Sequence, residues 1–204
     1  MSGIIMPCIL KETSEGSIRY TIQDEMFKRR EIACTGSITM ESADSLMLQL
    51  RCLQAEDPEK EITMYINSPG GDVCSGLAVY DVMQAVTCPV RTICAGMAAS
   101  MAAILFTGGD RRDIFPHARI MIHDPCLAAG ANGNALSVYS LGRDLMKVRK
   151  INGEIIAGHT HKKLDEILEK TAADSYFDAE EAVAFGLADR IIHQINTENG
   201  GGHE

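Results

Sequence analysis

Apolar runs of strand length alternate with helical patterns through most of this chain, and this alternation restricts the possible folds more than any other feature. The strand-like runs, each bounded by turn residues, cover 31–38, 61–67, 90–95 and 118–123. The helical patterns between them cover 41–56, 75–86 and 98–106. Strands that alternate with helices in this way predict an α/β fold with a parallel sheet and right-handed crossovers.

The length suits a single domain with a sizeable core. The 204 residues are 46% hydrophobic, and no window approaches eighteen uninterrupted apolar residues. We therefore expect one domain over 1–196 and no membrane span. The remaining segment, 197–204, is rich in glycine and polar residues and is expected to be a disordered tail.

Charge and cysteine usage narrow the range of partners and compartments. The net charge is −9, and no lysine or arginine cluster offsets it, which argues against a nucleic-acid-binding face. The seven cysteines never form a Cys-x-x-Cys pair, and several lie in apolar runs, so we expect buried, reduced thiols. The N-terminus lacks the features of a secretory signal. These observations predict a cytoplasmic protein.

The second half of the chain differs in composition and in the spacing of its apolar residues. The stretch 127–134 is rich in glycine, alanine and asparagine and suits a loop or a flat ribbon. A long helix is predicted over 136–160, because apolar residues recur at three- and four-residue spacing: Val138, Leu141, Leu145, Val148, Ile151 and Ile155. Such a helix either projects and packs on another subunit, which we favour, or folds back on its own domain. Short helices are expected over 162–171 and 178–185, with Gly186 as the C-cap of the second.

A serine at a predicted strand-to-helix junction is the strongest candidate for a nucleophile. Ser100 lies in Gly96-Met97-Ala98-Ala99-Ser100-Met101, shortly after an apolar run. A junction of this kind lifts a hydroxyl out of the sheet, and the serine then needs a base to take its proton. His123 ends the next strand-like run, at the carboxyl end of the sheet where sites in parallel sheets lie. The alternative is a structural histidine.

Two carboxylates are candidates to orient His123. Asp124 is adjacent, but neighbouring strand residues point to opposite faces, which disfavours it. Asp174 follows a predicted helix and precedes Ser175-Tyr176-Phe177, so it can reach the site from a loop. The pattern alone leaves this choice open, since the chain has many carboxylates.

A Gly-Gly turn is the candidate for stabilising an oxyanion. Asn67-Ser68-Pro69-Gly70-Gly71-Asp72 joins a predicted strand to a helix, and no side chain shields the glycine amides. The amides of Gly71 and Met101 could both point at a carbonyl oxygen bound over Ser100. A plain strand-to-helix turn is the alternative. A phosphate-binding loop would need a lysine and a hydroxyl at its end, and neither is present.

Four segments in this order resemble the proteolytic subunit of the Clp protease, the ClpP family. They are Tyr65-Ile66-Asn67-Ser68-Pro69-Gly70-Gly71, Gly96-x-Ala98-Ala99-Ser100-Met101, Arg119-Ile120-Met121-Ile122-His123-x-Pro125, and Glu180-Glu181-Ala182-x-x-x-Gly186-Leu187-x-Asp189. The resemblance runs from about Met6 to about Ile195.

The resemblance implies a serine peptidase whose catalytic residues are Ser100 as nucleophile, His123 as base and Asp174 as the orienting carboxylate. It assigns Gly71 and Met101 to the oxyanion hole. It also implies a crotonase-like βαβ spiral in which the 136–160 helix is a handle that joins two stacked seven-membered rings into a tetradecamer. Residues 1–20 would form the axial-loop region.

The same resemblance implies the partners. Unfolded proteins would be fed into a ring-shaped chamber by an AAA+ unfoldase of the ClpX, ClpA or ClpC type. The rings would contain this chain alone or mixed with a second ClpP. Hydrolysis would need no metal or nucleotide cofactor of its own.

The sequence also departs from the family. An Asp-Arg pair that usually precedes the catalytic aspartate, and forms ion pairs between rings, is replaced by Ala172 and Ala173. Large apolar residues of the unfoldase-docking pocket are replaced by Thr63, Ala85 and Ala95, while Tyr65 and Ile93 remain. These departures suggest a divergent paralogue.

Three functions are therefore weighed. The intact set of catalytic residues favours an active, self-compartmentalising serine endopeptidase. The departures favour a weakly active or structural partner subunit of a mixed ClpP assembly. A crotonase-fold acyl-CoA enzyme shares the oxyanion architecture, but a Ser–His pair in these motifs argues against it.

Overall fold

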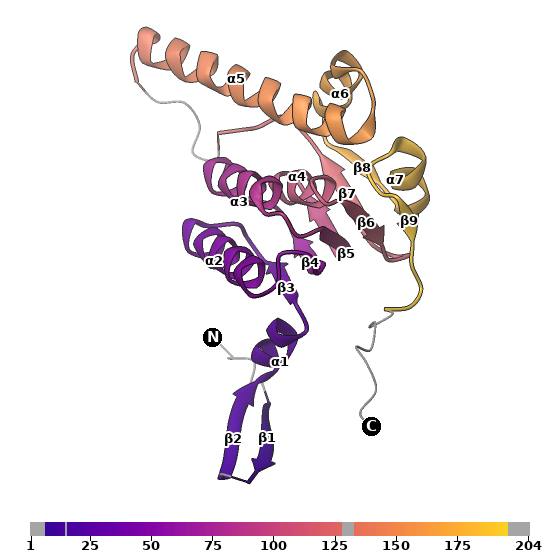
Figure 1. The fold of residues 1–204 in the computed structure, drawn as a ribbon. Helices are drawn as coiled ribbons and strands as arrows, with labels where there is room; N and C mark the ends of the chain where they lie inside the picture. The colour runs from indigo at the N-terminus through magenta and orange to yellow at the C-terminus, as the bar shows by residue number, and fades with distance from the viewer. Residues whose placement is uncertain (1–6, 15, 128–132, 196–204) are drawn as a thin grey trace.

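A mostly parallel sheet forms the centre of the molecule (Figure 1). The structure is a computed structural model in which residues 7–14, 16–127 and 133–195 are described. The parallel neighbours in order are β3 (Glu31–Thr35), β4 (Ile62–Ser68), β5 (Val90–Ala99), β6 (Arg111–Ile114) and β9 (Arg190–Ile191). The far end of β5 also pairs with β7 (Arg119–Ile122), to which β8 (Ser175–Phe177) adds antiparallel. The predicted α/β fold is confirmed.

Helices cover one face of this sheet (Figure 1). They are α2 (Met40–Glu56), α3 (Val73–Ala85) and α4 (Met101–Thr107). The side chains fully buried in and around this layer include Ile32, Leu50, Leu53, Ile62, Met64, Phe106 and Ile114. Each such side chain contributes about 1.5–3 kcal/mol through burial. Every residue of α4 is buried, which explains why its sequence shows no polar face.

The junction that carries Ser100 lies later than predicted. We expected a strand over 90–95 and a helix over 98–106, whereas β5 continues to Ala99 and α4 begins at Met101. The strand continues because its last residues pair with β7. This long-range pairing overrides the helical propensity of the alanines.

Short strands were missed by the sequence prediction. β6 reads Arg-Arg-Asp-Ile, and β8 and β9 span only 3 and 2 residues, too few to show a period of two.

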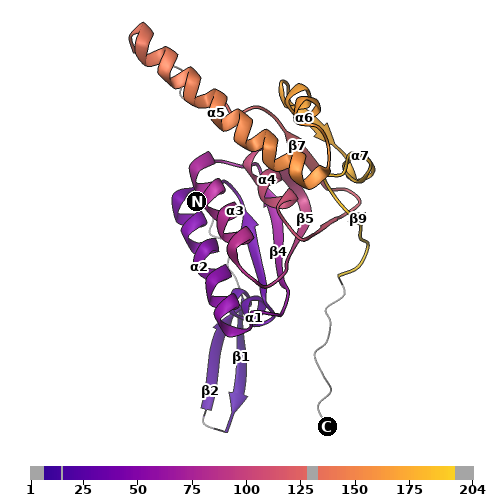
Figure 2. The same cartoon turned by 45° about the horizontal axis from the view of Figure 1, so that its top comes forward.

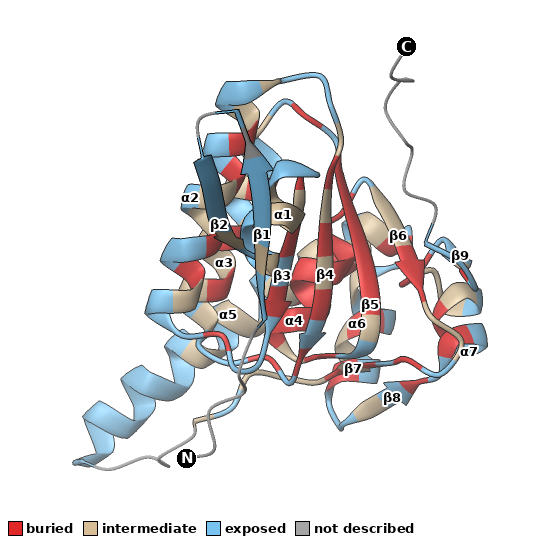
Figure 3. Cartoon of the chain, turned by 90° about the horizontal axis from the view of Figure 1, so that it is seen from below, coloured by how far each residue is buried: buried red, intermediate tan, exposed pale blue. Residues whose placement is uncertain are grey.

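Within the predicted axial-loop region, β1 (Cys8–Thr13) and β2 (Gly16–Thr21) form an antiparallel hairpin that stands away from the sheet, followed by α1 (Ile22–Lys28) (Figures 1 and 3).

A long helix projects from the domain (Figure 2). This helix, α5 (Ala135–Thr160), matches the predicted handle within one residue, and every residue from 135 to 144 is exposed. Its C-terminal part packs on α6 (Leu164–Thr171) through the small residue Gly153, where an added Cβ would lie 2.9 Å from Leu168. The last helix, α7 (Ala179–Phe185), ends at Gly186 in the left-handed conformation, as predicted.

The cysteines are less buried than expected. Cys34, Cys88 and Cys94 are buried, but Cys8, Cys52, Cys74 and Cys126 are exposed, and all are free. Burial raises the pKa of Cys34 to about 11 and that of Cys94 to about 12, so both thiols stay protonated at neutral pH. Within the described ranges, no helix is long and apolar enough to cross a membrane.

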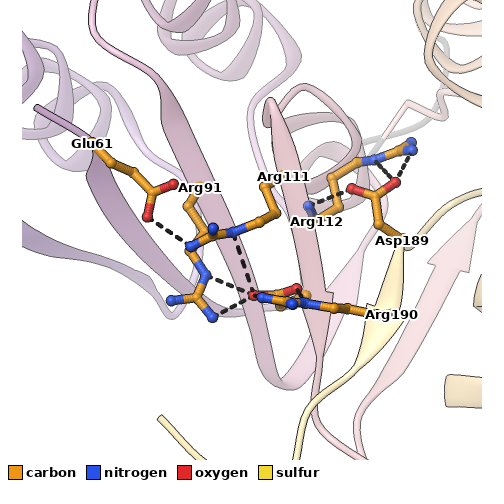
Figure 4. Close-up of polar contacts among 7 residues, drawn as sticks. Glu61, Arg91, Arg111, Arg112, Asp189 and Arg190 are labelled. Carbon is orange, nitrogen blue, oxygen red and sulfur yellow. Dashed lines mark hydrogen bonds and ion pairs between the residues drawn. The ribbon is translucent and has the colours of Figure 1, made fainter. Parts of the chain in front are cut away.

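The sheet face opposite α2, α3 and α4 carries a charged network, whose side chains are drawn in Figure 4. Asp113 is fully buried there. It accepts hydrogen bonds from Arg91 Nε at 2.6 Å and Arg190 Nε at 2.7 Å. Arg111 extends the network by donating to Glu61 at 2.8 Å. The strands β5, β6 and β9 are therefore linked by ion pairs as well as by the backbone ladder.

Replacing Asp113 with alanine is expected to destabilise the fold by about 3–5 kcal/mol, because Arg91 would remain buried without its partner. The matched control is Asp144→Ala, which removes an exposed ion pair with Lys147 and should change stability by less than about 1 kcal/mol. Urea unfolding at pH 7 measures both. Equal losses of stability in the two variants would show that the buried network contributes no more to stability than an exposed ion pair.

The same carboxylate should make stability depend on pH. Burial raises the pKa of Asp113, but hydrogen bonds from Arg190 and Arg91 and their charges outweigh burial, so the pKa lies below its ordinary value. A lowered pKa in the folded state contributes stability that is complete above the unfolded pKa of about 3.9 and is lost as pH falls through the folded value. The unfolding midpoint should therefore fall in this acid range more steeply for wild type than for Asp113→Ala.

Candidate active site

Ser100 lies in a strained turn between β5 and α4. Its φ of +55° and ψ of −121° belong to a region that residues with a side chain rarely occupy. Its amide donates to the Met121 carbonyl of β7 at 2.8 Å, which holds the turn against the neighbouring strand. The turn follows the carboxyl end of β5, so the hydroxyl lies at the edge of the sheet where parallel strands end.

The pairing of β7 with β8 brings His123 and Asp174 together. Their antiparallel register pairs Ile122 with Ser175, so the next positions along, His123 and Asp174, lie opposite each other. His123 Nε2 lies 2.8 Å from Ser100 Oγ, and His123 Nδ1 lies 3.3 Å from Asp174 Oδ1. The three residues predicted as catalytic thus form one continuous line. The Asp174 side chain is 61% exposed and that of His123 is 22% exposed, so solvent reaches the outer end of this line.

Asp124 has different partners. Its Oδ2 accepts from Arg149 Nε at 2.5 Å, and its Oδ1 accepts from Thr171 Oγ1 at 2.6 Å. Its amide also donates to the Thr171 carbonyl at 2.7 Å. Both carboxylate oxygens are engaged away from the histidine, which agrees with the expectation that adjacent strand residues face apart.

The Gly-Gly turn after β4 lies against the Ser100 turn. A Cβ added at Gly70, whose φ is +92°, would lie 2.8 Å from the Ser100 Cβ and 2.9 Å from the Met101 nitrogen. A Cβ at Gly71 would lie 2.2 Å from the Ile38 carbonyl oxygen. Only glycine allows this close approach at both positions.

The two amides predicted for the oxyanion hole are placed where each can donate. Met101 is the first residue of α4, and its N–H belongs to the turn that has no acceptor within the helix. Gly71 bridges Ile38 in parallel, with the Ile38 amide donating to Gly70 and the Asp72 amide donating to Ile38, both at 2.9 Å. In this pattern the Gly71 N–H points away from Ile38. That the two amides bind an oxyanion stays a prediction.

A pocket opens beside Ser100 between α4 and the C-terminal part of α5. Its lining includes Met101, Ile104, Ile122, Arg149, Asn152 and Ile156. Sequence reasoning missed Arg149 and Asn152, because polar residues of an amphipathic helix are expected on its solvent-facing side. Arg149 lies four residues before the buried Gly153, and Asn152 lies four residues before the buried Ile156; these spacings were the one signal that both residues share the inner face.

Asp72 is an ionisable residue at this edge of the sheet. Asp72 begins α3 by accepting hydrogen bonds from the Ser75 hydroxyl at 2.6 Å and amide at 2.8 Å, and these bonds lower the pKa of its carboxyl. Among the residues that the structure describes, no group of three or more His, Cys, Asp or Glu side chains is arranged to hold a metal ion.

A comparison with protein-family models matches this chain to the Clp protease family over residues 14–195. The matched range includes the whole sheet, α5, and all of the residues described in this site. It agrees with the resemblance found from four short segments of the sequence.

Proposed function

Because this chain belongs to the Clp protease family, we propose that it is a serine endopeptidase that cleaves unfolded proteins through Ser100, His123 and Asp174. Membership of the family implies a peptidase of the serine class. The identity of the catalytic residues, the enclosed chamber and the degree of activity are our proposals. The observation that carries them is the line of contacts from Asp174 through His123 to a serine held in a strained turn.

The geometry suits acyl transfer. With the Nδ1 proton of His123 held toward Asp174, Nε2 accepts the proton of Ser100 as its Oγ attacks the substrate carbonyl. The resulting oxyanion would accept hydrogen bonds from the amides of Gly71 and Met101. His123 then gives the proton to the departing amine, and water releases the acyl group from Ser100 by the reverse use of the same groups.

A fluorophosphonate probe tests this function directly, because it reacts with activated serines whatever the substrate preference. We expect covalent labelling of the purified protein at Ser100, read by mass spectrometry of the labelled peptide, in a particle much larger than one chain by light scattering. A large particle without labelling would instead support a structural subunit. Turnover of acyl-CoA thioesters would support a crotonase-type enzyme.

We propose that α5 joins subunits of stacked rings. The stripe predicted from the sequence is exposed along the N-terminal part of the helix, where Val138 and Leu141 are 39% and 37% exposed. In the C-terminal part, Gly153, Ile156 and Thr160 are buried against the same chain. One helix thus anchors to its own domain at one end and presents apolar side chains at the other, which favours burial against another copy.

Changing Leu141 to glutamate should break this association. The substitution would place a charge without a partner in the apolar contact between subunits, which is far more costly than a change on a free surface. Smaller species should appear in light scattering at micromolar protein concentration. Leu141→Met is the matched control and should leave the particle size unchanged. If the glutamate variant also keeps the full mass, α5 does not join the subunits.

A weakly active or structural partner subunit in a mixed ClpP assembly is the second candidate. It is favoured by the exposed Ala172 and Ala173 directly before Asp174, and by the charged sheet face. There, Thr63 pairs with Glu31 on one side and Arg91 on the other, so polar groups surround a position where the family carries a large apolar residue. Such a face offers few anchors to an apolar docking loop.

From this we expect the pure protein to couple poorly to an AAA+ unfoldase. Small peptides should be cleaved, whereas a tagged folded substrate should be degraded slowly until a standard ClpP is added. The double variant Thr63→Tyr with Ala85→Phe should partly replace that requirement. Degradation of the tagged substrate at the rate of a standard ClpP, by the unmodified protein alone with an unfoldase and ATP, would contradict this expectation.

A further inference from the structure

A residue that lines the pocket beside Ser100 carries a buried acceptor without a partner. Asn152 lines this pocket from α5. Its Oδ1 is buried and makes no hydrogen bond with any residue that the structure describes. A buried polar atom in this state is rare in folded proteins, because the lost hydration is not replaced. A bound molecule that donates a hydrogen bond would supply what the protein itself does not.

The charged groups of the pocket bond to each other and to neighbouring protein atoms. Arg149 donates to Asp124 at 2.5 Å and to the Leu168 carbonyl at 2.6 Å. Thr171 donates to the second oxygen of Asp124 at 2.6 Å. The charges of Arg149 and Asp124 offset each other, so this pair gives the pocket little net charge to attract a charged ligand. Asn152 is therefore the polar group of the pocket that can distinguish one substrate side chain from another.

The remaining walls are apolar. They are formed by Val73, Met101, Ile104, Ile122 and Ile156. Such walls suit the methylene stem of a side chain and leave its end group facing Asn152. An ammonium or guanidinium group would bring a charge into this environment beside Arg149, and a carboxylate has no proton to donate.

We propose that Asn152 makes this pocket select a carboxamide side chain, glutamine or asparagine, at the substrate residue whose carbonyl is attacked (P1). The proposal rests on the proposed peptidase function of Ser100. A carboxamide carries both a donor for the Asn152 Oδ1 and an acceptor for its Nδ2, so two amides can pair. The terminal torsion of an asparagine side chain is broad, which lets the amide turn toward a ligand.

Fluorogenic peptides that differ only at P1 test the selection. Glutamine and methionine have similar length and volume but differ in hydrogen bonding, so their ratio isolates the amide. We expect wild type to cleave the P1-Gln peptide with a kcat/KM on the order of ten times or more that of the P1-Met peptide, since a site built for a hydrogen bond rejects an analogue that lacks it. A wild-type preference for Met or Leu over Gln would overturn the proposal.

Variants of Asn152 separate this selection from general damage. Asn152→Leu should reverse the Gln-to-Met ratio while the P1-Met peptide is still cleaved. Asn152→Asp keeps the shape of the side chain but has only acceptors, and should move the preference toward P1-Lys. A Gln-to-Met ratio that stays at the wild-type value in both variants would overturn the assignment of Asn152.

Two readouts distinguish failure of this inference from failure of the proposed function. Labelling by the fluorophosphonate probe does not depend on P1, so labelling without a preference for glutamine rejects the selection alone. Binding to Ser100→Ala reports the pocket without chemistry, and there the P1-Gln peptide should bind more tightly than the P1-Met peptide. Equal affinities would reject the selection whatever the activity.

Discussion

Replacing Ser100 with alanine is expected to abolish peptide cleavage and fluorophosphonate labelling. The hydroxyl is the atom that would form the acyl-enzyme, and His123 Nε2 lies 2.8 Å from it. In a related type of catalytic triad, loss of a member leaves only the rate that comes from the oxyanion hole and binding, a loss on the order of 10⁴-fold or more. The measurement is kcat/KM with a fluorogenic peptide, together with the labelled mass.

Folding must be kept separate from chemistry in this experiment. Alanine should fit at position 100 with the turn intact, because the Ser100 side chain makes no capping hydrogen bond to α4. Particle size and the urea midpoint should therefore match wild type. A variant that assembles normally and still labels at the wild-type rate would remove Ser100 from the mechanism.

Asp174→Asn should lower kcat on the order of 10⁴-fold while leaving KM nearly unchanged. An asparagine amide presented to Nδ1 would favour the tautomer whose Nε2 carries the proton, and that tautomer cannot accept the proton of Ser100. The Asp174 side chain is 61% exposed, so the substitution should cost little stability. The pH dependence of kcat, followed from pH 5 to 9, reports whether the histidine still acts as base.

Asp124→Asn is the matched control for this experiment. It makes the same chemical change one residue from His123, on a carboxylate that is bound to Arg149 and Thr171. We expect a much smaller loss of kcat and a measurable loss of stability, because Arg149 would lose its charged partner. A larger loss of kcat at Asp124 than at Asp174 would reverse the assignment of the orienting carboxylate.

The sequence determined the fold class and the position of the candidate nucleophile. The alternation of apolar strands with buried helices is a local property, since each strand and crossover helix must be apolar wherever its neighbours lie. Small residues around Ser100 and two glycines at 70 and 71 mark close approaches of backbone that the structure contains. The apolar stripe of α5 could likewise be predicted from its three- and four-residue spacing.

Only the tertiary structure decided which carboxylate meets the histidine and which residues line the pocket. Asp174 faces His123 through the register of β7 and β8, and β8 is only 3 residues long, too short to be detected in the sequence. Arg149 and Asn152 are polar residues of a long helix, and only the packing of α5 against α4 and α6 places them in the pocket. Only the structure pairs the buried Asp113 with Arg91 and Arg190. Each of these contacts joins residues far apart in the chain, and local periodicity carries no information about such pairings.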